Sequence, residues 1–294
     1  MARAASYVGR FAPSPTGRLH MGSLIAALAS YAQARQQRGR WLLRMEDIDP
    51  PRERPGAAEA IEADLKRFGM SPDEPTLFQS TRTAAYQQAL DQMKASGHVF
   101  PCGCSRRHLG HGHLYPQTCS GGLPPGRERR SWRVRVSGRY GFDDLLQGAY
   151  GQQLETEVGA FILWRADGQP AYQLAVVVDD HFQGITEVVR GSDLIGSTPR
   201  QLFLQRLLGL PQPAYLHLPV ALNEQGNKLS KQTGARPIDP QQPMPALARA
   251  WSFLGQEKPP AEALTSPEAF WRWAPARWTI KLIPAVTEIP ENRL

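Results

Sequence analysis

The feature that most constrains the fold is a strand–loop–helix pattern at the start of the chain. The expected strand covers residues 7–11, the loop covers residues 12–17 and reads APSPTG, and an apolar helix face begins near His20. The N-terminus of such a helix offers free N–H groups and a partial positive charge, which suit a phosphate group. Gly17 and Gly22 allow the backbone to approach a ligand closely. The pattern therefore predicts a phosphate-binding turn, with His20 as a hydrogen-bond donor to phosphate oxygens.

The following segments continue the alternation of strands and helices. Expected strands cover residues 41–45, 185–190 and 217–222. Helical spacing of apolar residues predicts a helix over residues 59–68, one that is capped by Ser80, and one that begins at Ser197 or Thr198. Strands that alternate with helices predict an α/β fold with a parallel sheet covered on both faces.

Charge and length limit the classes of partner and location. The chain has 294 residues, with 34 Lys and Arg against 27 Asp and Glu, for a formal charge of +7. This balance favours a polyanionic partner, although a basic surface without a binding role is an equally good interpretation. No apolar run approaches the roughly 20 residues needed to span a bilayer. The first residues also lack the apolar segment of a signal peptide, so we expect a cytoplasmic protein without membrane contact.

A second loop has the composition of a phosphate clamp. Residues 227–232 read NKLSKQ, with glycines on either side. Two lysines that flank a serine suit a mobile contact with a polyphosphate, although this short pattern is weak when taken alone.

The segment of residues 100–139 interrupts the pattern and is rich in Gly, Pro, Cys, His and Arg. An odd number of clustered cysteines is a poor disulfide framework, so Cys102, Cys104 and Cys119 favour a zinc site over disulfides, with three metal-free buried thiols as the alternative. Chemistry alone leaves the fourth ligand open among His108, His111, His113 and Tyr115.

Two later segments carry weaker signals. Residues 131–136 alternate apolar and basic side chains, which predicts a half-buried strand with Arg133 and Arg135 on its outer face, where they contact either RNA phosphates or solvent. The C-terminal part is rich in tryptophan, which favours a small helical core over base stacking.

The motif segments together resemble a known enzyme class. Residues 20–23 (HMGS) and 228–232 (KLSKQ) resemble the HIGH and KMSKS motifs of class I aminoacyl-tRNA synthetases. Residues 10–17 (RFAPSPTG) resemble the first loop of the glutamyl-tRNA synthetases, and three further blocks match that family in order: 43–49 (LRMEDID), 172–180 and 189–193 (VRGSD). The resemblance covers residues 7–234. It implies a Rossmann-like catalytic domain over residues 1–99 and 141–234, an inserted zinc-binding subdomain over 100–140, and a short helical region over 235–294.

The resemblance also implies roles for single residues. It assigns the glutamate substrate to Arg10, Ser14, Glu46, Tyr172 and Arg190. This set suits the ligand, because two carboxylates and one ammonium need two cationic anchors and one anionic anchor. In isolation, Glu46 could instead pair with a surface arginine, Tyr172 could be a core residue and Arg190 a solvated strand end.

The same resemblance implies the ATP site and the metal site. ATP, with Mg²⁺, is expected to contact His20, Gly22, Lys228, Ser230 and Lys231, of which His20, Lys228 and Lys231 would be catalytic. The short members of the family place a tyrosine four residues before the last cysteine. This spacing selects Cys102, Cys104, Tyr115 and Cys119 as ligands of a structural zinc.

Residues 235–294 are too few for an anticodon-binding domain with its connecting helices, which narrows the resemblance to the truncated paralogues, the glutamyl-Q tRNA(Asp) synthetases. That family activates L-glutamate with ATP without tRNA and attaches it to queuosine in the tRNA(Asp) anticodon. We expect such an enzyme, as a monomer. The alternatives are a conventional glutamyl-tRNA synthetase, a nucleotidylyltransferase that acts on another small molecule, and an inactive paralogue that binds tRNA or a partner.

Overall fold

The computed structural model describes residues 6–105, 114–223, 225–229 and 237–290. Its centre is a parallel sheet in which β1 (Val8–Phe11) pairs with β2 (Arg40–Met45), and β2 pairs with β3 (Leu77–Phe78). A second parallel pair, β9 (Glu187–Gly191) and β10 (Ala214–Leu218), lies on the other side of β1. The N–H of Thr186 donates to the carbonyl of Val8 at 2.9 Å and joins the two parts. The strand order is therefore β3-β2-β1-β9-β10, and the order reverses between β1 and β9.

The helices cover this sheet and fill the connections between its strands. They are α1 (Met21–Gln36), α2 (Ala57–Arg67), α3 (Thr83–Ala95), α5 (Tyr172–Phe182), α6 (Thr198–Leu208), α7 (Pro243–Phe253) and α8 (Pro267–Trp273). Among the helices of the described residues, none combines the length and the apolar character needed to cross a bilayer.

The period of two along each strand gives the sheet two distinct faces. Trp41, Leu43, Val189 and Leu216 pack against α1 and the C-terminal helices. Val8, Leu42, Val188 and Tyr215 point to the opposite face, toward Leu202 of α6. Two residues further along, this second face carries charged and polar side chains at the carboxyl ends of the strands: Arg10, Arg44, Arg190 and His217.

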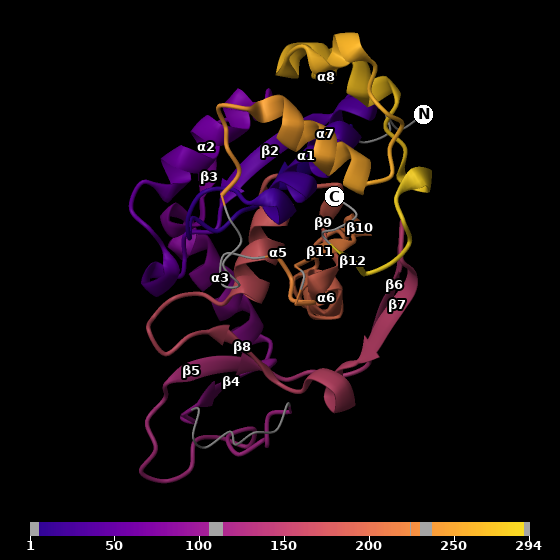
Figure 1. Ribbon diagram of the computed structural model, residues 1–294. Coiled ribbons are helices and arrows are strands. Elements are labelled where there is room, and N and C mark those ends of the chain that lie inside the picture. The colour runs from indigo at the N-terminus through magenta and orange to yellow at the C-terminus, as the bar shows by residue number, and fades with distance from the viewer. Residues whose placement is uncertain (1–5, 106–113, 224, 230–236, 291–294) are drawn as a thin grey trace.

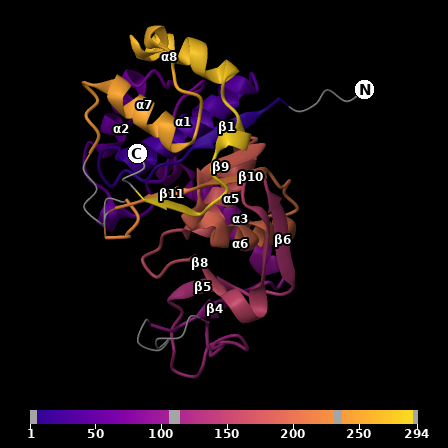
Figure 2. The ribbon, with the colours of Figure 1, turned by 45° about the vertical axis from the view of Figure 1, so that its right-hand side comes forward.

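The tryptophans of the C-terminal region pack over α1. The indole of Trp278 is buried and donates to Gln33 Oε1 at 2.7 Å, and Trp271 meets Tyr31 edge to face at 4.6 Å. Figures 1 and 2 show α7 and α8 next to α1 at one end of the molecule. The prediction that these tryptophans form a core is confirmed.

The remaining strands form small sheets. One is antiparallel and lies at the end of the molecule opposite to α8 (Figure 2): β4 (Val99–Cys102), β5 (Ser131–Val134) and β8 (Phe161–Trp164). A hairpin of β6 (Arg139–Asp144) and β7 (Gly148–Gln153) connects that end to β10. Near the cavity described below, β11 (Val220–Leu222) pairs in parallel with β12 (Glu288–Pro290). The division of the chain into domains stays a prediction.

Three local predictions are wrong. Ser80 does not cap α3, because it lies in a preceding turn, where its hydroxyl binds Asp47, and the helix begins at Thr83. The expected strand 217–222 is two strands, because Pro219 has no N–H to continue the ladder. Arg133 does not face outward: it is buried, donates to the carbonyl of Ala160 at 2.8 Å and stacks on the ring of Tyr115.

Candidate active site

A cavity of about 550 Å³ opens at the carboxyl ends of β1 and β9. Ligands of open α/β sheets bind at this kind of place, where the strand order reverses, because the loops on either side diverge. Its wall contains eight of the residues predicted from the sequence: Arg10, Ser14, His20, Gly22, Glu46, Tyr172, Arg190 and Lys228. The other two residues predicted to contact glutamate or ATP, Ser230 and Lys231, lie outside the described residues.

Arg10 is held by a buried carboxylate. Its Nε donates to Asp180 Oδ1 at 3.2 Å and its Nη1 donates to the carbonyl of Val189 at 3.4 Å. Asp180 also pairs with Arg44, which is wholly buried. Burial raises the pKa of Asp180, but Arg44 and Arg10 outweigh that effect and hold it below its usual value. An ionised Asp180 thus fixes the guanidinium of Arg10 at the edge of the cavity.

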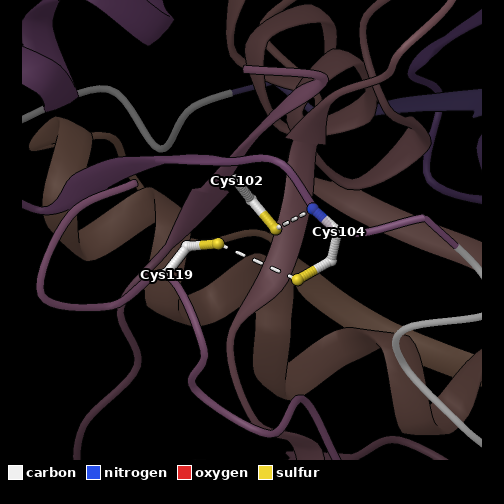
Figure 3. Close-up of side chains that lie close together, drawn as sticks. All are labelled: Cys102, Cys104 and Cys119. Atoms are coloured by element: carbon white, nitrogen blue, oxygen red, sulfur yellow. Dashed lines mark hydrogen bonds between the residues drawn. The ribbon is translucent and has the colours of Figure 1, made fainter. Parts of the chain in front are cut away.

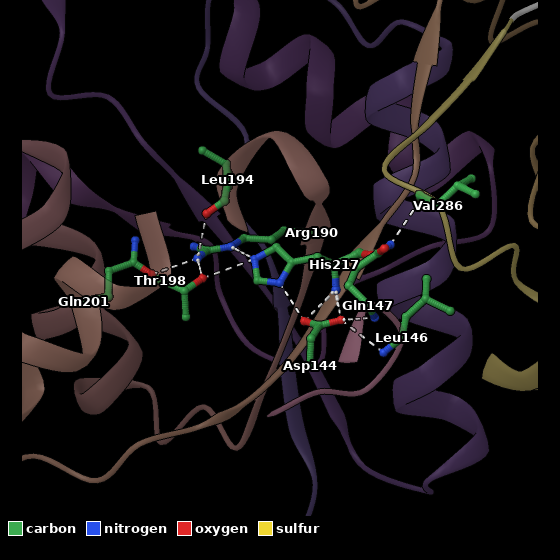
Figure 4. Close-up of polar contacts among 9 residues, drawn as sticks. All are labelled: Asp144, Leu146, Gln147, Arg190, Leu194, Thr198, Gln201, His217 and Val286. Atoms are coloured by element: carbon green, nitrogen blue, oxygen red, sulfur yellow. Dashed lines mark hydrogen bonds and ion pairs between the residues drawn. The ribbon is translucent and has the colours of Figure 1, made fainter. Parts of the chain in front are cut away.

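Arg190 lies across the cavity floor and is only 5% exposed. Its Nε donates to His217 Nε2 at 3.1 Å, and its Nη2 donates to Thr198 Oγ1 at 2.8 Å and Gln201 Oε1 at 2.9 Å (Figure 4). Its Nη1 reaches the hydroxyl of Tyr172 at 3.4 Å. The interpretation of Arg190 as a solvated strand end is therefore excluded.

Glu46 is one of two acidic residues that line the cavity among the described residues, the other being Asp193. Its N–H donates to the carbonyl of Pro13 at 3.0 Å, which ties the end of β2 to the first loop. Arg44 and Arg52 pair with other carboxylates, so neither forms the surface pair considered for Glu46. Removal from water raises the pKa of Glu46 to about 7, against the opposing effect of Arg44 and Arg10.

Tyr172 is the first residue of α5, and its ring lines the same cavity. Burial and the nearby Glu46 raise the pKa of its phenol, and Arg190 opposes them only in part. The hydroxyl therefore stays protonated and can donate to an anionic ligand.

The N-terminus of α1 faces the cavity through its cap. His20 is the N-cap, and its Nδ1 accepts from the N–H of Ser23 at 3.3 Å. A neutral imidazole that accepts at Nδ1 carries its proton on Nε2. His20 thus has a fixed donor at the end of a helix dipole, and both favour a phosphate group.

The second loop packs directly on this turn. The N–H of Leu229 donates to the carbonyl of Ala221 at 2.7 Å, and Lys228 Nζ pairs with Asp193 Oδ2 at 2.5 Å. A Cβ placed on Gly22 would lie 3.1 Å from the carbonyl oxygen of Leu229. The two phosphate-binding segments predicted from sequence are therefore in contact.

The sequence interpretation gave no role to Asp144, Asp180 or His217, which hold the two arginines. Asp180 belongs to one of the matched blocks, but nothing in its spacing indicates an arginine partner. Asp144 and His217 are 73 residues apart and meet only through the packing of β6 on β10.

A second cluster lies at the far end of the molecule. The three sulfur atoms of Cys102, Cys104 and Cys119 are within 4.8 Å of one another (Figure 3). The hydroxyl of Tyr115 lies 3.4 Å from Cys102 Sγ and 4.0 Å from Cys104 Sγ. Burial raises the pKa of the Cys102 thiol, but hydrogen bonds from Tyr115 and the N–H of Cys104 lower it to about 7. His108, His111 and His113 lie outside the described residues.

Comparisons with known proteins place the chain in a family. Residues 7–114 and 128–242 match the family described as tRNA synthetases class I (E and Q), catalytic domain. The chain is 51% identical to a glutamyl-Q tRNA(Asp) synthetase of Aromatoleum aromaticum over 288 residues, which are 96% of this chain and 91% of that protein. It is 52% identical to the protein of that name from Dechloromonas aromatica over 95% of this chain and 96% of that one.

A solved structure shares the fold at lower identity. A glutamate tRNA ligase from Elizabethkingia meningosepticum superposes with a TM-score of 0.81 at 22% identity, over 98% of this chain and 68% of that one. The family match covers most of the chain, and the relatives are more than half identical to it. The chain therefore belongs to the class I tRNA synthetases for glutamate and glutamine, within the glutamyl-Q tRNA(Asp) synthetase family.

Proposed function

We propose that the cavity binds ATP and L-glutamate and joins them as glutamyl-adenylate without RNA. The observation that carries this proposal is the placement of two oriented arginines, Arg10 and Arg190, around one cavity with Glu46. This charge set complements the two carboxylates and the ammonium of glutamate. The adjoining α1 N-terminus gives the same cavity a place for phosphate.

In this proposal each charged group of glutamate has its own partner. Arg190 and Tyr172 bind the side-chain carboxylate, because both present donors at the cavity floor. Glu46 accepts from the ammonium, and Arg10 and Ser14 orient the α-carboxylate toward the ATP site. The substrate is thus held in the geometry from which it reacts.

Activation needs no protein nucleophile. An oxygen of the α-carboxylate attacks the α-phosphorus of ATP, the bond to the β-phosphate oxygen breaks, and pyrophosphate leaves with that electron pair. His20 Nε2–H, Lys228 and Lys231 stabilise the charge that develops on the phosphates. ATP brings Mg²⁺, which neutralises phosphate charge when bound. Gly22 and Ser230 complete the ATP contacts.

The names of the relatives point to the second step. We propose that a hydroxyl of queuosine in the tRNA(Asp) anticodon attacks the adenylate carbonyl and that AMP leaves. The basic balance of the chain suits such a polyanionic partner. A cytoplasmic location and a monomeric state stay predictions.

The cysteine cluster fits a structural zinc ion. In a tetrahedron with zinc–sulfur bonds of about 2.3 Å, ligand atoms are about 3.8 Å apart, and Cys104 Sγ lies 3.8 Å from Cys119 Sγ. Tyr115 would supply the fourth donor. Arg127, whose Nη1 is 3.7 Å from Cys104 Sγ, would offset part of the thiolate charge. With four protein ligands the ion would have no open position for catalysis.

ATP–pyrophosphate exchange with purified protein and no RNA tests the proposal, with glutamine and aspartate as control substrates. We expect exchange with glutamate alone, its loss in Glu46→Gln, and its retention in Glu59→Gln, which changes an exposed glutamate of α2. Exchange only after tRNA addition would indicate a conventional glutamyl-tRNA synthetase. Absence of exchange under every condition would indicate a paralogue that only binds its partner.

A further inference from the structure

The network behind Arg190 contains two residues to which the proposed chemistry gives no role. His217 is wholly buried and Asp144 is 5% exposed. His217 of β10 is the register partner of Arg190 in β9, and Asp144 ends β6 on the other side of His217. Figure 4 shows the three side chains in a row that ends at Arg190.

The direction of each hydrogen bond in this row is fixed by Arg190. A guanidinium can only donate, so His217 Nε2, 3.1 Å from Arg190 Nε, carries no proton. The proton is therefore on Nδ1, which donates to Asp144 Oδ2 at 2.6 Å. Burial lowers the pKa of His217 and Arg190 lowers it further, while Asp144 opposes them. His217 thus stays neutral and accepts from Arg190.

Asp144 is itself fixed by the backbone. It accepts from the N–H of His217 at 3.1 Å, of Leu146 at 3.0 Å and of Gln147 at 2.9 Å. Burial raises the pKa of Asp144, but His217 and these N–H groups outweigh that and keep it ionised. The row therefore begins at a rigid carboxylate in the hairpin and ends at the cavity.

The acceptors of the five Arg190 N–H groups show which donors remain for a ligand in the cavity. Of five N–H groups, His217 takes the one on Nε, and Thr198 and Gln201 take the two on Nη2, with the carbonyl of Leu194 a more distant acceptor at 3.4 Å from the same nitrogen. Nη1 gives one to Tyr172 and keeps one for a ligand. Because the Tyr172 hydroxyl accepts from Arg190, its own proton is available to the ligand as well. The cavity floor thus offers two donors, which a carboxylate accepts and which the NH₂ group of an amide opposes.

We propose that His217 and Asp144 are positioning residues that hold Nη1 of Arg190 toward the cavity and so select glutamate over glutamine. This inference rests on the proposed function, because it takes the glutamate side chain as the ligand of Arg190. The test measures pyrophosphate exchange by the full chain with glutamate and with glutamine, and compares the two substrates.

His217→Leu removes the acceptor of Arg190 Nε. We expect the KM for glutamate to rise at least ~tenfold and the preference for glutamate over glutamine to fall at least ~tenfold, because an unpaired buried donor lets Arg190 turn away. The KM for ATP should stay within about twofold, since ATP contacts other residues. His217→Gln can accept from Arg190 and donate to Asp144, so it should restore most of the preference. His98→Leu, at an exposed histidine, is the control.

Asp144→Asn, which is nearly isosteric, provides a second variant if His217→Leu does not fold. It should lower the preference for glutamate in the same direction. In an Arg190→Lys background, His217→Leu should add little, because its effect acts through the guanidinium. Folded variants with unchanged KM and preference, or full additivity with Arg190→Lys, would overturn the positioning role. Failure of the wild-type protein to exchange with glutamate would instead overturn the proposed function.

Discussion

The carbonyl oxygen of Leu229 sits over Gly22, so that a Cβ at position 22 would lie only 3.1 Å from it. The same Cβ would lie 3.2 Å from the His20 ring, so Gly22→Ala must displace the second loop and the His20 ring by a few tenths of an ångström. We expect the KM for ATP to rise and kcat for pyrophosphate exchange to fall, together by ~10–100-fold, because small displacements of phosphate contacts are costly. Gly121→Ala is the matched control, since a Cβ there meets nothing within 4 Å. Unchanged kinetics in Gly22→Ala would mean that the loops do not need this contact.

The KM for glutamate should depend on pH through Glu46. Its pKa of about 7 in the cavity lies above the ordinary value of 4.5, so at pH 6 most of the carboxylate is protonated and must lose that proton to bind an ammonium. We expect the KM to be ~tenfold higher at pH 6 than at pH 8. Pyrophosphate exchange across this range measures it. A flat KM would show that Glu46 is already ionised before the substrate binds.

Glu46 should also make the stability of the fold depend on pH, but in the opposite direction: low pH weakens glutamate binding and favours the folded state. A raised folded-state pKa means that the folded chain favours the protonated form. Its contribution is fully present below pH 4.5 and is lost as the pH rises toward 7. Glu46→Gln should therefore gain stability relative to the wild type at pH 8 but not at pH 4, as measured by urea unfolding. The reverse order would contradict the assigned desolvation of Glu46.

Purified protein should contain one zinc ion per chain by elemental analysis. Cys119→Ser should lose the ion and unfold at a lower temperature, because the ion then lacks one of its three cysteine ligands. Activation of glutamate should persist below that temperature, since β4, which ends at Cys102, lies at the other end of the molecule from α1 and β9 (Figure 1). Ser120→Ala removes the neighbouring hydroxyl, which donates to the carbonyl of Gln117 at 2.7 Å and not to a sulfur, and should keep the ion. A wild-type protein without metal would refute the site.

Trp278→Leu should destabilise the fold by ~3 kcal/mol, because it leaves a cavity beside α1 and removes the partner of Gln33. The free energy of unfolding in urea measures the effect. Leu282→Ala, at a side chain that is 48% exposed, should change it by less than ~0.5 kcal/mol. Equal effects at the two positions would show that the C-terminal core contributes little.

The sequence predicted the βα units well because their signals are local. The strand pattern of residues 7–11, the loop after it and the apolar side chains of Leu24, Leu28 and Tyr31 are sufficient to predict β1 and the start of α1. Arg10, Glu46 and Arg190 line one cavity because each lies at or just beyond the carboxyl end of a strand, and β1 lies between β2 and β9. Local spacing, however, could not reveal Arg133, which breaks the alternation of its strand because the Tyr115 ring and the Ala160 carbonyl lie beneath it.

The residues that hold Arg190 in place could not be predicted from the sequence either. His217 and Asp144 matter only because β10 lies beside β9 and the β6–β7 hairpin returns across β10. These relationships depend on packing between segments that are distant in the chain. No local pattern of residues records such contacts.

The parallel pairing of β11 with β12 has a consequence for the order in which parts of the protein fold. The strand that leads into the second loop pairs in parallel with residues 288–290, and the N–H of Val220 donates to the carbonyl of Thr287 at 2.9 Å. The pairing of β1 with the start of β9 likewise spans most of the chain. Contacts of such long sequence separation form slowly, since loop closure precedes the gain from pairing. The cavity should therefore assemble last, after synthesis of the C-terminal strand, and a ribosome-bound nascent chain should fold its α1 region before it can activate an amino acid.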